Sequence, residues 1–265
     1  MKTKLFTKSH DQSILEKIDK EGGQFTAQEH AFAIQQEFGR IFVDRTTLVR
    51  EYLSQNYEKL GALGFLIEII NQYSYKWIIS LGAGHCVLEY ILSWAIPLNG
   101  KVVAADFDTF MVEKSQELFP EIITIEYDFF NHDPQRLIDS IGFVPEIAIF
   151  FGSAYVMDDD CFIKQLKGLK QVGIDMIIDF HAGCISVNQM FRQIIKERIR
   201  SILGEKKINK ALRIIRPAVS TYKGKFHGWG RTKGELRRLY SQSGWVTISE
   251  QKVGQYEYVA ILKAL

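Results

Sequence analysis

Two glycines and two aspartates in this chain have the types and spacing to hold a ligand against the backbone. Gly82 and Gly84 follow the apolar run 77–81, and an amphipathic stretch begins just after them. Asp106 lies 24 residues after Gly82, at the end of the next apolar run, and Asp128 ends the run after that. Glycines let a ligand approach the backbone, and a carboxylate at the next strand end can accept hydrogen bonds from both ribose hydroxyls. The set favours a bound nucleotide over a turn followed by two helix caps.

The elements that must position these residues alternate along the chain. Short apolar runs occupy 77–81, 101–106, 121–128, 145–152 and 174–179, with helical patterns between them at about 85–95, 109–118, 133–141 and 159–171. Continuous apolar strands separated by helices predict a parallel sheet covered on both faces. A further helix runs from Thr232 to Gly244, and two strands joined at 252–255 close the chain as a hairpin. We expect an α/β fold with a doubly wound, mostly parallel seven-stranded sheet and a C-terminal antiparallel hairpin.

Two segments lie outside this alternation of strands and helices. The first, residues 1–74, has apolar residues at helical spacing and no strand-like alternation, which predicts a helical N-terminal cap. The second is basic: between Arg192 and Arg238 there are fifteen Lys and Arg residues and three Glu, a net +12 in a chain whose total is +2. The expected domains are the cap (1–74), the core (75–183 and 231–265) and a basic helical and loop insertion (184–230). We expect the insertion to roof the site.

The bulk composition narrows the class of protein. Apolar residues make up 46% of the chain and charged residues 24%, which suits a globular domain with a sizeable core. No apolar run reaches the roughly 18 residues of a membrane span, and the first residues lack the apolar centre of a signal peptide. Cys86, Cys161 and Cys184 form no CxxC pair, which favours free thiols in a reducing compartment. We expect a cytoplasmic protein with no membrane partner.

Several segments resemble the class I S-adenosylmethionine-dependent methyltransferases. The matching stretches are ISLGAGHC for the glycine loop, VVAADFD for the ribose-binding acid and YDFF for the adenine-contacting acid. Residues 149–180 resemble the fourth strand, fourth helix and fifth strand of such enzymes, and TKGELRRLYSQSGW resembles their final helix. The resemblance covers about 76–183 and 231–265, and it implies the fold and the cofactor but no substrate. The chain departs from the family at Ser80, where an acid is usual, and at Cys86, where a third glycine is usual.

The resemblance implies backbone contacts to the cofactor. The main chain of Gly82, Ala83 and Gly84 would contact the methionine part of S-adenosylmethionine. The main chain at Gly152 would lie near the sulfonium. His85, inside the loop, would face either the cofactor or solvent.

The resemblance also implies contacts to the nucleoside part of the cofactor. Asp106 would hold the ribose, and Phe107 would pack on the adenine. Asp128 would accept a hydrogen bond from the adenine amino group, with Phe129 beside it.

The acceptor of the methyl group is expected beyond the carboxyl ends of the strands. Methyl transfer from a sulfonium is an in-line displacement, which alignment and a general base would accelerate. The candidate bases are His181 in DFHAG and His227 in FHGWG, and the alternative for His181 is local packing or capping. The candidate substrate contacts are Tyr155, Tyr222 and Trp229.

The loop after the fourth strand disfavours other chemistries. It reads FGSAY, whereas amino-directed nucleic-acid methyltransferases carry Asp or Asn, two prolines and an aromatic residue there. No Pro-Cys dipeptide is present for attack on cytosine C5. The acidic run 158–160 could suggest a metal, but a helix N-cap and first turn explain it better, so we expect no metal.

Four hypotheses follow. The leading one is methyl transfer to a hydroxyl, amine or carboxylate of a small metabolite, an anionic one being favoured by the basic insertion. The second is an RNA-modifying methyltransferase that uses the basic surface 192–238. The third is a non-catalytic binding protein with the methyltransferase fold. A dehydrogenase is disfavoured because Val87 stands where a dinucleotide fingerprint has its third glycine.

Overall fold

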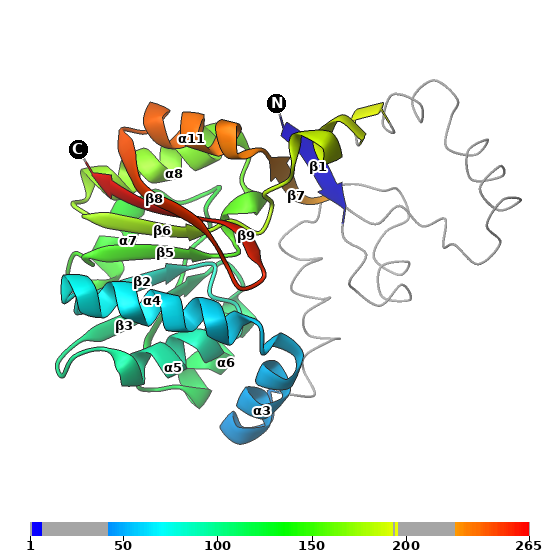
Figure 1. Cartoon of the computed structure of the whole chain (residues 1–265). Helices are drawn as coiled ribbons and strands as arrows, with labels where there is room; N and C mark the ends of the chain where they lie inside the picture. Colours follow the sequence, from blue (N-terminus) through cyan, green and yellow to red (C-terminus); the bar gives the residue numbers. More distant parts are fainter. Residues whose placement is uncertain (1, 7–41, 193, 196–225, 265) are drawn as a thin grey trace, which may run out of the picture.

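A seven-stranded sheet lies at the centre of the molecule in the computed structural model, which describes residues 2–6, 42–192, 194–195 and 226–264 (Figure 1). Five strands are parallel: β2 (Trp77–Leu81), β3 (Lys101–Asp106), β4 (Ile123–Glu126), β5 (Ile147–Phe151) and β6 (Met176–Phe180). The hairpin of β8 (Trp245–Val253) and β9 (Tyr256–Ala264) completes the order β4-β3-β2-β5-β6-β9-β8. Strand β9 is antiparallel to both of its neighbours. The predicted doubly wound sheet with a C-terminal hairpin is confirmed.

Helices cover both faces of the sheet, because successive strand residues point to opposite sides. Ile78 packs in one core with α4 (Lys59–Tyr73), α5 (Val87–Ala95) and α6 (Thr109–Leu118). Ile79 packs in the other core with α7 (Pro134–Ile141), α8 (Asp159–Gln171) and α11 (Lys233–Gln242). A short 3-10 helix, η1 (Ala154–Val156), follows β5. The strands are therefore apolar on both faces, as a covered parallel sheet requires.

Side-chain caps fix where these helices begin. Asp133 accepts hydrogen bonds from the amides of Gln135 and Arg136, and Pro134 follows it at the first helical position, where a missing N–H costs nothing. Asp108, Asp158 and Thr232 cap α6, α8 and α11 in the same way. Asp158 is thus an N-cap, and the two acids after it occupy the first turn of α8, as predicted for that acidic run.

The N-terminal helical region is divided into two helices. Helix α3 (Arg45–Asn56) begins at the N-cap Asp44, and α4 starts after a short break at Tyr57 and Glu58. The face of α4 that carries Leu63 and Leu66 is buried in the core shared with α5. This helix therefore covers the sheet directly.

One strand lies in the N-terminal region that was predicted to be wholly helical, so that prediction is wrong there. Strand β1 (Lys2–Phe6) pairs antiparallel with β7 (Phe226–Arg231), with Lys2 opposite Arg231. The two strands form a separate two-stranded sheet. A five-residue segment is too short to show a period, and its pairing depends on a partner more than 200 residues away in the sequence. The region of the predicted cap and that of the predicted insertion are therefore joined by backbone hydrogen bonds (Figure 1).

None of the helices in the described ranges combines the length and apolarity needed to span a lipid bilayer.

Candidate functional site

The glycine loop lies where the strand order reverses. Strand β2 has β3 on one side and β5 on the other, so the connections after β2 and β5 leave the sheet in opposite directions. In open α/β sheets, ligands bind in the crevice that this divergence creates at the carboxyl ends of the strands. Residues 82–86 follow β2, and residues 152–153 follow β5.

Different physical constraints explain why Gly82 and Gly84 are glycines. Gly82 has φ of 75°, and a Cβ there would lie 2.5 Å from Cβ of Ser153. The Ser153 hydroxyl also donates a hydrogen bond to the carbonyl of Leu81, so close packing of β2 against β5 requires Gly82. Gly84 has φ of 59°, and a Cβ there would meet no atom of the described residues within 4 Å. Among those residues, the backbone at Gly84 therefore borders open space.

Asp106 lies against this loop. Its carboxylate accepts hydrogen bonds from the N–H of Gly84 at 2.8 Å and the N–H of Asp108 at 3.1 Å. Burial raises the pKa of Asp106 to about 6, and the two backbone bonds oppose that rise. Each carboxylate oxygen has two lone-pair positions, so the group can still accept hydrogen bonds from a ligand.

The second acidic position, Asp128, is hydrogen-bonded within its own turn. Asp128 accepts hydrogen bonds from the N–H of Phe130 at 2.8 Å and from the side-chain amide of Asn131 at 2.6 Å. Phe129 is 8% exposed and lies 3.6 Å from the Cβ position of Gly82, so it borders the loop. Phe107 is half-buried directly after Asp106.

Ser80, which stands where the methyltransferase pattern usually has an acid, is hydrogen-bonded to a buried carboxylate. The hydroxyl of Ser80 donates to Oε1 of Glu89 at 2.6 Å. Glu89 lies in the first turn of α5 and is 4% exposed. An acidic group is therefore present beneath the loop, although it comes from the helix and not from the strand.

The second departure is a matter of backbone shape. Cys86 has φ of 57° and lies immediately before α5. A glycine adopts this left-handed conformation freely, whereas another residue is strained there by about 1–2 kcal/mol. The Cys86 thiol is buried, and burial raises its pKa well above the usual value. The loop thus keeps its shape without the third glycine.

His85 packs against α3 and against the turn that precedes it. Its ring stacks on Phe42 with centroids 5.5 Å apart and meets the ring of Tyr52 at the same distance. Burial, followed by the nearby charge of Lys59, lowers the pKa of His85 to about 4. The imidazole is therefore neutral at physiological pH.

The residues after β5 and β6 form the side expected to receive the acceptor. A Cβ on Gly152 would lie 3.2 Å from the hydroxyl of Tyr256. Tyr155 fills the space between the turn after β6 and strand β7, since a Cβ on Gly183 or Gly228 would lie within 2.7 Å of it. Burial raises the pKa of Tyr155, and that of Tyr256 to about 12, so both phenols stay neutral and can donate hydrogen bonds.

The predicted substrate contacts are brought together in part. The carbonyl of Trp229 lies 2.5 Å from the Cβ position of Gly183, so Trp229 and Tyr155 meet on the same turn. Tyr222 lies outside the described residues. His227 belongs to β7, but its side chain is outside the described part of the structure.

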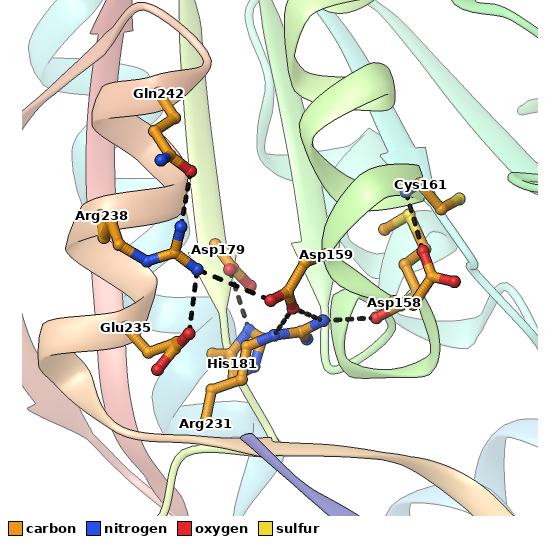
Figure 2. Close-up of polar contacts among 10 residues, drawn as sticks. Asp158, Asp159, Cys161, Asp179, His181, Arg231, Glu235, Arg238 and Gln242 are labelled. Atoms are coloured by element: carbon orange, nitrogen blue, oxygen red, sulfur yellow. Dashed lines mark hydrogen bonds and ion pairs between the residues drawn. The ribbon is translucent and has the colours of Figure 1, made fainter. Parts of the chain in front are cut away.

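His181 is wholly buried beside the carboxyl end of β6 (Figure 2). Its Nδ1 lies 3.0 Å from Oδ2 of Asp179, which also accepts a hydrogen bond from the hydroxyl of Tyr240 at 2.7 Å. Its Nε2 is buried and has no hydrogen-bond partner in the described ranges. The carboxylate orients the ring as in a catalytic dyad, but burial keeps Nε2 from an acceptor in this conformation. The role of His181 as a base stays a prediction.

A buried ion pair lies next to this histidine. Arg231 is fully buried, and its Nε and Nη2 donate to Oδ1 of Asp159 at 3.1 and 3.0 Å (Figure 2). Nη2 also donates to the carbonyl of Met157 at 2.6 Å. Asp159 is thus engaged by arginine, and the described residues contain no group of three His, Cys, Asp or Glu side chains that could hold a metal ion.

Sequence reasoning missed Glu89, Lys59, Tyr256 and Arg231. Glu89 had a signal, because it interrupts the apolar face of the helix that carries Val87, Leu88 and Leu92. The other three had none, since their surroundings come from distant parts of the chain.

Comparison with known proteins identifies the fold. No protein-family model and no curated protein sequence matches this chain. Among solved structures, human N-acetylserotonin methyltransferase in complex with S-adenosylmethionine matches with a TM-score of 0.55 and 14% identity, over 95% of this chain and 66% of that one. Mitomycin 7-O-methyltransferase MmcR matches with a TM-score of 0.53 and 13% identity, over 96% of this chain and 67% of that one.

These matches define the class of fold. The chain has the class I S-adenosylmethionine-dependent methyltransferase fold that its sequence predicted. It spans about two thirds of the length of either matched protein.

Proposed function

We propose that this protein is an S-adenosylmethionine-dependent methyltransferase that acts on a small molecule. The observation that carries the proposal is the loop at the switch point of the sheet. Gly84 borders open space there, and its N–H is held by a carboxylate that keeps free lone pairs. A turn alone would need neither the open space nor the buried Asp106.

The residues at this edge fit the cofactor. The backbone of residues 82–84 would approach its methionine part, Asp106 would accept from the ribose hydroxyls, and Phe107 would pack on the adenine. Asp128 retains lone pairs for the adenine amino group, although local bonds already hold it. When bound, the cofactor supplies an electrophilic methyl group on a sulfonium.

We propose a hydroxyl as the acceptor group, with an amine or a carboxylate as alternatives. Support comes from the name of one matched structure, a 7-O-methyltransferase. The neutral phenol of Tyr256, beside Gly152, would donate a hydrogen bond to an acceptor and orient it for in-line attack, and the ring of Tyr155, beside Gly183 and Gly228, would line the same side. The basic stretch that suggested an anionic acceptor lies mostly outside the described residues, so that preference rests on the sequence.

The buried dyad has a test of its own. If His181 is a positioning residue, His181→Ala should lower the free energy of unfolding by about 1–3 kcal/mol, because Asp179 loses a partner. Turnover per folded molecule should then stay within about tenfold of wild type. A loss of about a hundredfold in an intact fold, with cofactor affinity unchanged, would establish the predicted base.

Calorimetry with S-adenosylmethionine and S-adenosylhomocysteine tests the proposed function. Wild type should bind both, and Asp106→Ala should bind each at least about tenfold more weakly, since it removes the acceptor of two ribose hydroxyls. Asp139→Ala is the control, because Asp139 is exposed on α7. If wild type binds neither ligand, the third hypothesis of a non-catalytic binding protein would replace this one.

A further inference from the structure

Glu89 carries a buried carboxylate oxygen for which the described residues provide no hydrogen-bond partner. Its Oε1 accepts from Ser80 at 2.6 Å, whereas Oε2 is buried and has no hydrogen-bond partner in the described ranges. Burial raises the pKa of Glu89, and the bond from Ser80 and the charge of Lys59 oppose that rise. A buried polar atom without a partner destabilises the fold, so this oxygen calls for a physical explanation.

A cation lies close to this carboxylate without pairing with it. Lys59, at the start of α4, donates from Nζ to the hydroxyl of Tyr52 at 3.2 Å and lies 5.3 Å from the centre of that ring. It is half-buried, and burial lowers the pKa of its ammonium. An ammonium has three donors, so Lys59 keeps donors for another partner.

The two charges flank the glycine loop. Glu89 follows it in α5. Lys59 is close enough to His85, within the loop, to lower the pKa of that imidazole. Tyr52, the partner of Lys59, packs directly on the His85 ring. A carboxyl group and an ammonium group thus lie beside one loop on two helices, each with hydrogen-bonding capacity that the described residues leave unused.

We propose that Glu89 and Lys59 together bind the amino-acid end of the cofactor, with Lys59 donating to the α-carboxylate and Glu89 Oε2, which is buried in this structure, accepting from the α-ammonium after its side chain turns toward the ligand. This inference rests on the proposed function and assigns residues that the loop pattern does not contain. It also explains why Ser80 is tolerated at a position where an acid is usual. The serine hydroxyl holds in place a carboxylate that α5 supplies.

Two ligands that differ only at the amino-acid end provide the test. S-adenosylhomocysteine carries the zwitterion, and 5′-methylthioadenosine has the same nucleoside and thioether without it. Calorimetry should be run with both on wild type, Glu89→Gln and Lys59→Met, with Glu68→Gln as a control that makes the same chemical change at an exposed position of α4. Wild type should prefer S-adenosylhomocysteine by at least about tenfold.

In each of the two site variants, that preference should fall about tenfold or more while affinity for 5′-methylthioadenosine stays within about twofold. An unchanged preference, or an equal loss for both ligands, would overturn the proposal. If wild type binds both ligands equally well, the inference fails and the proposed function survives. If wild type binds neither, the proposed function itself fails. If Glu89→Gln does not fold, the proposal is tested with Lys59→Met, at a half-buried position, by the same ratio of the dissociation constants of the two ligands.

Discussion

At the scale of single residues, Gly82 and Gly84 are two residues apart yet answer to different constraints. Both adopt positive φ, but among the described residues a neighbour crowds Gly82 alone: Ser153, just after the adjacent strand β5. Packing thus explains the glycine at 82, and contact with the proposed ligand would explain the glycine at 84.

This difference predicts opposite phenotypes for two alanine substitutions. Gly82→Ala should destabilise the fold by about 2–5 kcal/mol, because left-handed strain adds to a steric clash. Gly84→Ala should cost only the strain, about 1–2 kcal/mol, but should weaken S-adenosylhomocysteine binding because its methyl group enters the open space. Urea unfolding and calorimetry measure the two effects. Equal stabilities would contradict the packing role of Gly82.

The pKa of Asp106 predicts how ligand binding depends on pH. Ribose hydroxyls donate to the ionised carboxylate, and with a pKa of about 6 only about a tenth of the molecules are ionised at pH 5. The dissociation constant of S-adenosylhomocysteine should therefore be about tenfold higher at pH 5 than at pH 7. In Asp106→Asn this dependence should shrink; if it persisted in full, another group would be responsible.

The same carboxyl affects stability with a defined sign. Its pKa is above the usual value, so the folded state binds its proton more tightly than the unfolded state does. Its contribution to stability should fall as pH rises from about 4 to about 6. Before the binding measurements at pH 5, circular dichroism must therefore show that the protein is still folded at that pH.

The site residues that sequence could predict are those fixed by local position. Glycines after one strand and an acid after the next meet because parallel strands end at one edge, and Gly84 does contact Asp106. Glu89 and Lys59 could not be predicted in this way. Their nearness depends on how α4 and α5 pack against each other, which no spacing within either helix encodes.

At the scale of elements, the buried ion pair between Arg231 and Asp159 links β7 to α8. Arg231 ends β7, and Asp159 opens α8. The Arg231 side chain is 0% exposed and that of Asp159 20%, so water cannot replace the carboxylate around the guanidinium.

Breaking this pair should be costly. Asp159→Ala should lower the free energy of unfolding by about 3–5 kcal/mol, because it leaves a buried guanidinium without a counter-charge. The control is Asp160→Ala, the exposed neighbour in the same helical turn, which should change stability by less than about 1 kcal/mol. Chemical denaturation of both variants decides, and similar losses would show that helix electrostatics dominates.

The core elements were predictable because each has its own period and its own cap. The predicted helices at 109–118 and 159–171 coincide with α6 and α8, whose N-caps Asp108 and Asp158 are in the sequence. Strand β1 was not predictable, since its five residues carry no period and pair with β7 only through tertiary contact. The break between α3 and α4 likewise lies within a continuous apolar pattern.

At the scale of the whole molecule, the proposed ligand would touch segments from most of the core. The glycine loop, the ends of β3 and β5, helices α4 and α5 and the start of β9 all border the same edge. Binding should therefore stabilise the fold as a unit.

This predicts a thermal shift. At a S-adenosylhomocysteine concentration one hundred times its dissociation constant, stabilisation of about 2.7 kcal/mol should raise the Tm by about 5–10 °C for a chain of this size. Asp106→Ala at the same ligand concentration should show a smaller shift. A wild-type Tm that does not move would contradict binding to the native state.

The pairing of β1 with β7 has a consequence for the order of folding. Lys2 pairs with Arg231, 229 positions further along the chain, which makes this the contact with the greatest loop-closure entropy among the strand pairs described. During synthesis β1 emerges from the ribosome long before β7. It therefore stays unpaired while the main sheet assembles strand by strand. The small sheet should then close after the nucleus has formed, and its hydrogen bonds should strengthen the finished molecule without accelerating its assembly.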